Sequence, residues 1–220
     1  MEFFLTTVLK LIPFLRVTIL IAFTSMALGL IFGTLLAAMK MCRIKILKTI
    51  ANLFTTFIRC TPVIVLIFLA YYGLPVLFGL AGIDINGVSK IVFSIIALTM
   101  YASGTLSEII RPAYLSVDKG QMEAALMSAL TPAQAIRLII LPQVVKRIIP
   151  PMGNEFITLV KDTSLAQVIA VVELLKVTNN WVSSAVSMVP FVIAAVFYLV
   201  MNGVVTRCFT IAEKRLSYYR

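Results

Sequence analysis

The chain alternates long apolar runs with short polar connections, and this pattern predicts its overall architecture. A helix needs about 20 mainly apolar residues to cross the hydrocarbon core of a bilayer. Five runs meet this requirement, and residues 1–15 before them are expected to form a helix along the outer surface. The expected transmembrane helices cover residues 17–39, 53–72, 91–110, 148–174 and 187–205. The pattern therefore predicts an all-α integral membrane protein whose residues 1–220 form one domain with five transmembrane helices.

The distribution of lysine and arginine predicts the orientation, because cytoplasmic connections are enriched in both residues. The first connection carries four basic residues, and the long connection over residues 111–147 carries five. The connections over residues 73–90 and 175–186 carry one lysine each. This asymmetry places the basic connections and the C-terminus in the cytoplasm and the N-terminus outside, although Lys10 and Arg16 favour the opposite.

Composition agrees with a membrane protein and excludes several functions. The chain is 61% hydrophobic and 13% charged, whereas soluble domains are about 45–50% apolar and 25% charged. The net charge of +10 is divided among connections between apolar runs, which does not suit a nucleic-acid surface. Without histidine, and with three cysteines at unrelated spacings, no metal site is expected. No phosphate-binding Gly-x-x-x-x-Gly-Lys run is present, so the chain is not expected to bind ATP itself.

The longest polar connection contains start signals for two short helices. Thr131 is placed as an N-cap, Pro132 takes the first helical position, and Gln134 is spaced to bond back to the cap. Asp118 and Gln121 repeat this spacing earlier in the connection. Apolar residues follow both caps at helical intervals, so we expect two amphipathic helices at a membrane face. Such a surface suits the docking of a partner protein; the alternative is a helix that lies on lipid.

The same connection resembles a known docking loop. The run EAA at residues 123–125 and an Ile-x-Leu-Pro run ending at Pro142 resemble the EAA loop of ABC-importer permeases. Ala129 stands where that family has glycine. In that family the loop helix inserts into a groove of the cytoplasmic ATPase, so the resemblance implies a coupling role. The residues that this role involves are Gly120, Gln121, Glu123, Ala124, Ala125, Ala129 and Pro142.

Two further motifs resemble permeases that import polar amino acids. Residues 59–62 (RCTP) and 71–75 (YYGLP) are similar to the RGTP and YFGLP runs of that group. Cys60 and Leu66 replace a glycine and a glutamine that are common there. The proline of the first run predicts an irregular helix. Arg59 is expected at a membrane edge, where it either extends to the headgroups or contacts the coupling loop or the ATPase.

The end of the third expected span carries a pair of opposite charges. Glu108 and Arg111 are three residues apart and share a helical face, so we expect a structural ion pair. The Glu-x-x-Arg run before a Gly-Gln pair also resembles the permease family, although Pro112-Ala113 replaces the glycine pair found there.

The fourth expected span carries polar and ionisable side chains, which are costly inside a membrane and are functional candidates. Glu155 and Asp162 differ by only about 20° in helical direction, with Thr158 beside them, and Glu173 is expected to continue this face. The face is predicted to line a water-filled path; the alternative is a Lys161–Asp162 pair that only joins two protomers. The candidate substrate-binding residues are Asn154, Glu155, Thr158, Lys161, Asp162, Ser164 and, from the second span, Thr61.

Residues 153–175 are closely similar to the family run that ends Lys-Asp-Thr-Ser-Leu, and the whole resemblance covers about residues 18–175. It implies the permease subunit of a type I ABC importer of the histidine, glutamine and arginine type, in a bacterial cytoplasmic membrane. Such a subunit is not an enzyme and holds no cofactor, because a separate ATPase dimer binds ATP and Mg. The implied partners are that ATPase, a second permease subunit (identical or a paralogue) and an extracytoplasmic solute-binding protein, and the implied mechanism is alternating access.

The acidic face favours a cationic amino acid (arginine, lysine or histidine) over glutamine, and both over cystine or an acidic substrate. Two other functions stay open at this point. An ion-coupled secondary carrier would use Glu155 and Asp162 as coupling sites and would need no ATPase. A scaffold subunit that transports nothing would not need the polar fourth span.

Overall fold

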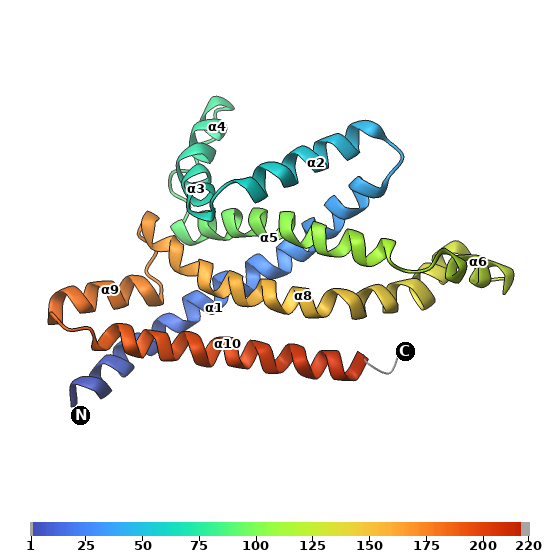
Figure 1. Ribbon diagram of the computed structural model, residues 1–220. Helices are drawn as coiled ribbons and strands as arrows, with labels where there is room; N and C mark the ends of the chain where they lie inside the picture. Colours follow the sequence, from blue (N-terminus) through green and yellow to red (C-terminus); the bar gives the residue numbers. More distant parts are fainter. Residues whose placement is uncertain (1, 217–220) are drawn as a thin grey trace.

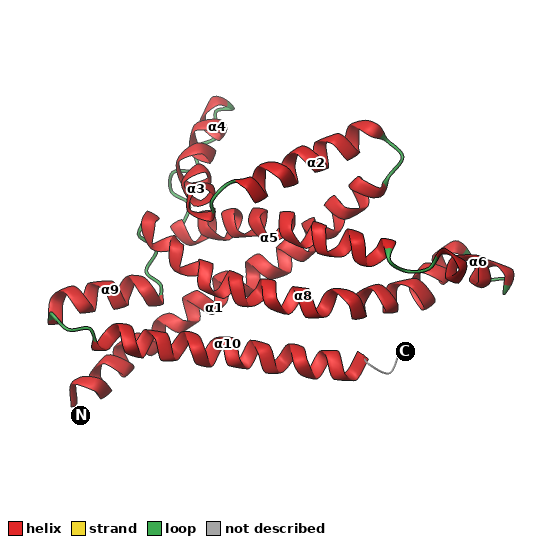
Figure 2. Ribbon diagram, in the orientation of Figure 1, coloured by secondary structure: helices red, strands yellow, loops and turns green. Residues whose placement is uncertain are grey.

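The computed structural model describes residues 2–216, and all regular secondary structure in this range is helical (Figures 1 and 2). Residues 1 and 217–220 of the expected domain lie outside the described part. The α-helices are α1 (Glu2–Met41), α2 (Lys45–Cys60), α3 (Val63–Phe68), α4 (Leu74–Leu80), α5 (Lys90–Leu115), α6 (Lys119–Met127), α7 (Pro132–Ala135), α8 (Leu141–Asp162), α9 (Leu174–Ala185) and α10 (Val189–Leu216). Three irregular segments continue them: the π-helical turns η1 (Leu69–Gly73) and η2 (Ile136–Ile140), and the 3-10 segment η3 (Thr163–Ile169).

Four helical segments within residues 2–216 are long and apolar enough to cross a membrane. They are Glu2–Met41, Val63–Leu80, Lys90–Leu115 and Val189–Leu216. The fourth expected span begins in α8, which packs against α5 and α10 (Figure 1). Its 22 residues include five charged side chains. This composition distinguishes α8 from the four apolar segments named above. The prediction of an all-helical membrane protein is confirmed.

The N-terminal boundary was predicted wrongly. Residues 1–15 were expected to form a separate surface helix, but α1 is continuous over 40 residues and passes through Pro13. At 1.5 Å per residue this helix is about 60 Å long, roughly twice the thickness of the hydrocarbon core. α1 is therefore much longer than a helix needs to be to cross the hydrocarbon core.

The second expected span, residues 53–72, is interrupted in the middle. α2 ends at Cys60, Thr61 is extended with φ −98° and ψ 128°, and α3 begins at Val63. Proline lacks an N–H group and disfavours helical geometry in the preceding residue, so Pro62 causes this break. The apolar segment that can cross the membrane is shifted to Val63–Leu80.

The fourth expected span, residues 148–174, is shorter than predicted. The α-helix ends at Asp162, η3 continues to Ile169, and Ala170 has a left-handed conformation with φ 59°. The chain then turns into α9. Residues after Ile169 therefore do not share the helical face of α8.

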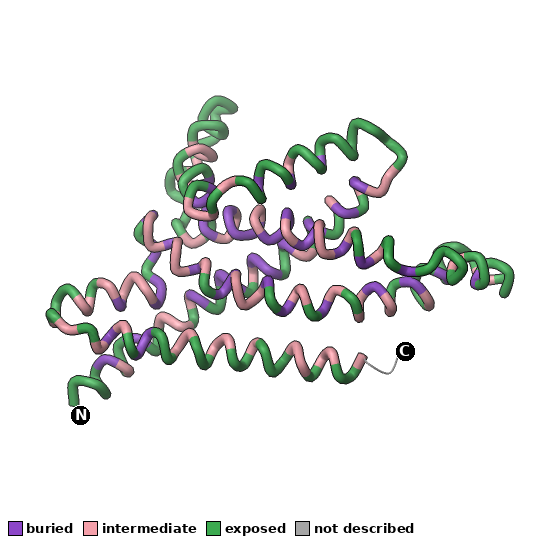
Figure 3. Tube along the Cα trace, in the orientation of Figure 1, coloured by how far each residue is buried: buried purple, intermediate pink, exposed green. Residues whose placement is uncertain are grey.

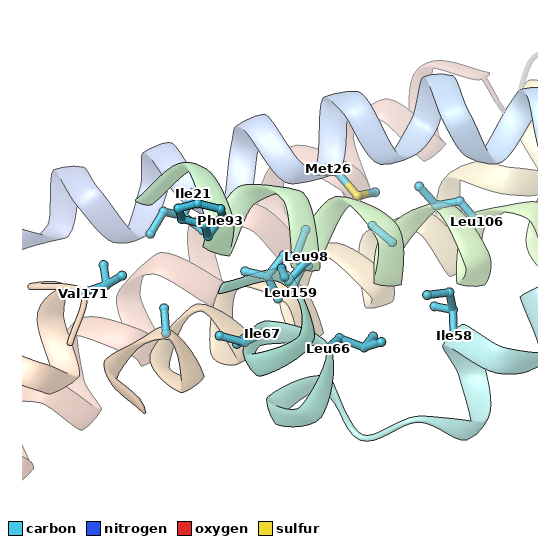
Figure 4. Packing of buried hydrophobic residues seen from close by; sticks show 14 of the residues in the cluster. Ile21, Met26, Ile58, Leu66, Ile67, Phe93, Leu98, Leu106, Leu159 and Val171 are labelled. Carbon is cyan, nitrogen blue, oxygen red and sulfur yellow. The ribbon is translucent and has the colours of Figure 1, made fainter. Parts of the chain in front are cut away.

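The core forms where α1 crosses α5. A Cβ atom on Gly29 would lie 2.6 Å from Cβ of Ala102, and one on Gly33 would lie 2.9 Å from Cβ of Leu106. Small residues let helices approach closely in membranes, where packing rather than the hydrophobic effect drives association. Buried side chains from α1, α2, α3, α5 and α8 meet beside this crossing (Figure 4), while much of α4 and α10 is exposed (Figure 3).

Connections of like character lie at the same end of the bundle. The α1–α2 turn, α6 and the last turns of α10 lie at one end, and the beginning of α1 and α9 lie at the other (Figure 1). The basic connections thus lie at the opposite end from α9, which holds one of the two connections poor in lysine and arginine.

Candidate functional site

The buried carboxyl group of Glu155 is the centre of the candidate site. Its residue is 9% exposed, and its Oε1 atom has no hydrogen-bond partner among the described residues. Thr105 of α5 lies beside this carboxylate, and its hydroxyl group donates to the carbonyl oxygen of Tyr101 at 3.2 Å. An unsatisfied carboxylate oxygen in a buried position is costly unless a ligand or ion completes it.

Asp162 lies close enough to Glu155 for their charges to interact. Both carboxylates also act on Tyr101 of α5. Tyr101 and Thr105 are four residues apart and therefore lie on one face of α5. The structure thus brings Glu155 and Asp162 together, as expected from their helical directions, and places two hydroxyl groups of α5 opposite them.

Tyr101 and Thr105 were missed in the sequence. Their spacing continues to Glu108, so these three polar residues follow one helical stripe of a span that also carries Ser94, Thr99, Ser103 and Ser107. This polar stripe was the sequence pattern that could have identified Tyr101 and Thr105 as site residues.

The remaining predicted site residues are arranged differently. Lys161 and Asn154 are exposed. The hydroxyl groups of the other three donate to carbonyl oxygens of their own helical turns and have no bond to Glu155. These bonds are Thr158 to Asn154 at 3.1 Å, Ser164 to Lys161 at 2.7 Å and Thr61 to Phe57 at 2.6 Å.

The expectation that Glu173 extends the acidic face is wrong. Glu173 is fully buried and caps the N-terminus of α9, where its carboxylate accepts from the N–H groups of Leu175 (2.9 Å) and Lys176 (2.7 Å). The hydroxyl group of Tyr198 donates to the same carboxylate at 3.5 Å. Because the chain leaves the helical path after Ile169, this carboxylate serves α9 and not the face of α8.

The predicted Glu108–Arg111 ion pair is also corrected. Glu108 forms its ion pair with Lys40, from the last turn of α1, and Lys40 also donates to Ser107 Oγ at 3.0 Å. The positive charges of Arg59 and Arg111 act on Glu108 without forming its ion pair. A partner 68 positions away in the sequence is decided by helix packing and not by local spacing.

The coupling connection folds into α6, α7 and η2. The N–H group of Gly120 donates to Asp118 Oδ1 at 2.6 Å, which caps α6. The capping box at α7 is present: the N–H of Gln134 donates to Thr131 Oγ1 at 3.3 Å, and the N–H of Thr131 donates to Gln134 Oε1 at 2.8 Å. The predicted helix starts at Asp118 and Thr131 are thus confirmed.

Ala129 ends α6 in an unusual conformation. Its φ angle is +60°, and the N–H groups of Ala129 and Leu130 donate to the carbonyl oxygens of Leu126 (3.1 Å) and Ala125 (3.2 Å). This pair of bonds is a Schellman motif, whose left-handed position is usually glycine. Ala129 therefore carries backbone strain at the position where the resembling family has glycine.

One side of α6 packs against the bundle and the other side is open. Ala125 is buried, and Met122 packs against the cluster that contains Ile140. Glu123 and Ala124 are exposed, and Met127 is 89% exposed. α6 lies at the end of the bundle (Figure 1), so a partner can reach its open side. Among the other predicted coupling residues, Gln121 is exposed and Pro142 is half-buried.

Comparison with known proteins shows the family of this chain. Residues 29–218 match the family described as "Binding-protein-dependent transport system inner membrane component". The chain is 36% identical over 202 residues to the probable glutamine ABC transporter permease protein GlnM of Bacillus subtilis (strain 168). The matched region covers 91% of this chain and 90% of the relative. It is 34% identical over 208 residues to the L-cystine transport system permease protein TcyL of the same organism, covering 94% of this chain and 87% of the relative.

A solved structure gives the same result. The crystal structure of an amino acid ABC transporter with histidines matches with a TM-score of 0.80 and 32% identity, over 94% of each chain. The family implies an ATPase and a binding protein as partners. The chain therefore belongs to the family of binding-protein-dependent inner membrane components, as the permease subunit of an amino-acid ABC transporter.

Proposed function

We propose that this permease imports a cationic L-amino acid by alternating access, driven by a separate ATPase dimer that holds ATP and Mg. The observation that carries the proposal is the buried Glu155 carboxylate, whose Oε1 atom has no partner among the described residues. Asp162 adds a second negative charge nearby. The cation next to it in sequence, Lys161, is exposed.

Electrostatics favour a cation at this place. A buried carboxylate without a counter-charge is costly, and a bound cation offsets that cost. The hydroxyl groups of Tyr101 and Thr105 supply neutral hydrogen-bonding groups beside it. GlnM and TcyL are named for glutamine and cystine respectively, so family membership does not determine the substrate. The local negative charge supports the choice of a cationic amino acid.

The coupling role is assigned to the open side of α6. Glu123, Ala124 and Met127 are exposed there, while Ala125 anchors the helix to the bundle. A rigid, capped helix transmits displacement because it moves as one body. ATP-driven closure of the ATPase dimer would then bring the α6 helices of two permease subunits together, and hydrolysis would reset the inward-facing state.

We place α6 and the end of α10 on the cytoplasmic side and the start of α1 outside. The support is that basic connections lie at one end of the bundle (Figure 1) and that such connections are usually cytoplasmic. A single cysteine at position 84, in a variant lacking the natural cysteines, should react with an impermeant reagent from outside. Reaction from the cytoplasmic side alone would show that the proposed orientation is wrong.

A second permease subunit, identical or a paralogue, is part of this proposal. One bundle encloses little volume, and the α8 edge with Asn154 and Lys161 exposed needs a polar or aqueous neighbour. The domain over residues 1–220 would then be one half of the membrane assembly.

The test is uptake by the complex reconstituted in vesicles, with labelled arginine and labelled glutamine. We expect arginine to be preferred, and Glu155→Gln to lower arginine uptake about tenfold or more because the counter-charge is lost. Asp84→Asn is the matched control, because Asp84 is an exposed carboxylate in the connection before α5. Glutamine preference unchanged by Glu155→Gln would reject the charge argument. Uptake without ATPase, driven by an ion gradient, would instead favour a secondary carrier.

A further inference from the structure

An apolar groove of about 570 Å³ lies between α1, α2 and α5. Ten of its twelve lining residues are apolar, and the two polar ones are Thr99 and Ser103 of α5. Along α1 the lining runs from Leu28 to Met39, which is 11 positions or about 16 Å of helix. The groove is open to its surroundings, since Leu35 in its wall is 55% exposed. In a chain that crosses a membrane, a groove with this lining suits a hydrocarbon chain.

One end of the groove leads to the turn that joins α1 to α2. Met39 lies near the end of α1, and Ile50 lies five positions after the first residue of α2. Three basic residues with exposed side chains stand in this short stretch, namely Arg43, Lys45 and Lys48. Along the axis of α2, Lys48 is about 3 Å and Lys45 about 8 Å from Ile50. The long basic side chains therefore lie at the mouth of the apolar groove.

These three positive charges have no acidic partner. Residues 3–83 contain neither aspartate nor glutamate. Within the described part of the chain, Arg43, Lys45 and Lys48 form no ion pair, and Glu108 is already paired with Lys40. Uncompensated cations beside an apolar groove are complementary to an amphiphile that has a negatively charged head group.

We propose that this groove binds an anionic phospholipid, with an acyl chain between α1, α2 and α5 and the phosphate group against Arg43, Lys45 and Lys48. Guanidinium and ammonium groups bind phosphate through charge-assisted hydrogen bonds. Each basic residue beside the membrane surface strengthens the binding of anionic lipid by about fivefold. The lipid would join the hairpin of α1 and α2 to the helix that carries Tyr101 and Thr105. Its binding would be independent of which amino acid the permease carries.

Two other occupants fit the apolar lining but do not use the basic turn. A zwitterionic lipid fills the groove equally well, yet its head group has no net charge for the three cations. A helix of a second permease subunit would exclude lipid from the groove altogether. The charge at the mouth therefore favours the anionic lipid, and the three occupants give different results in one experiment.

The experiment uses the purified permease–ATPase complex in nanodiscs of phosphatidylcholine that contain a small fraction of a photoreactive lipid. The probe is phosphatidylglycerol or phosphatidylcholine, each with a diazirine group on one acyl chain. Mass spectrometry measures the labelling of residues 28–39 and 50–54, which include the α1 and α2 walls of the groove. We expect phosphatidylglycerol to label them about tenfold or more strongly than phosphatidylcholine. High salt should reduce the difference, because it screens exposed charges.

Two pairs of substitutions test the basic turn. Arg43→Gln with Lys45→Gln should remove most of the preference for phosphatidylglycerol, whereas Arg43→Lys with Lys45→Arg keeps both charges and should retain it. The matched control is Arg207→Gln with Arg215→Gln, which removes two exposed cations from α10. This control should leave the preference unchanged.

Three results would overturn the proposal. The first is equal labelling by the two lipids. The second is a preference that survives Arg43→Gln with Lys45→Gln while the ATPase is retained. The third is no labelling of the groove by either lipid, which would show that protein covers it.

Discussion

Lys40 at the end of α1 is joined to Glu108 of α5 by an ion pair, 68 positions apart in the sequence. The two side chains differ in exposure: that of Lys40 is 1% exposed and that of Glu108 is 37% exposed. The buried ammonium group of Lys40 therefore needs the counter-charge more than the partly exposed carboxylate of Glu108 does. The pair fixes the end of α1 to the last part of α5, directly before the coupling connection.

The first prediction concerns this pair. Glu108→Gln should destabilise the protein by about 1–3 kcal/mol, because the buried Lys40 loses its counter-charge. The partial exposure of Glu108 keeps the effect below that of a fully buried pair. Thermal unfolding in detergent measures it. The double variant Lys40→Met with Glu108→Gln is the control and should be more stable than Glu108→Gln alone, and equal stability of the two would contradict the prediction.

The second prediction concerns the left-handed residue at the end of α6. Ala129→Gly should stabilise the turn by about 1 kcal/mol, since glycine adopts φ +60° without the steric cost of a Cβ atom. Ala129→Val should destabilise the same turn. Hydrogen exchange of the N–H groups of Ala129 and Leu130, which close the turn, reports the change. Faster exchange of Leu130 in the glycine variant would be the opposite result.

The third prediction concerns docking. Glu123→Lys and Ala125→Pro should each abolish retention of the ATPase on the detergent-purified permease while membrane insertion continues. The first reverses a charge on the open side of α6, and the second costs about 3 kcal/mol in the helix interior. Asp118→Asn, which keeps an N-cap, is the control. If both variants retain the ATPase as well as the control does, α6 is not the docking helix.

The sequence alone determined the features that depend on short separations. Apolar runs of sufficient length predicted a helical membrane protein, because backbone groups in lipid need internal hydrogen bonds. The capping box of Thr131 and Gln134 was predicted correctly, since its atoms come from residues three positions apart. Glu155 and Asp162 were placed on one side of α8 because the periodicity of a single helix fixes their directions.

The tertiary structure decided everything that depends on how one helix lies against another. The close approach of Gly29 to Ala102 sets the alignment of α1 on α5, and this alignment makes Lys40 and not Arg111 the ion-pair partner of Glu108. The same kind of packing places Thr105 beside Glu155. Glu173 became a helix cap because the chain turns at Ala170, a left-handed position that no apolar pattern predicts. Such contacts join distant residues, and their geometry follows from the packing of whole helices, which local periodicity does not encode.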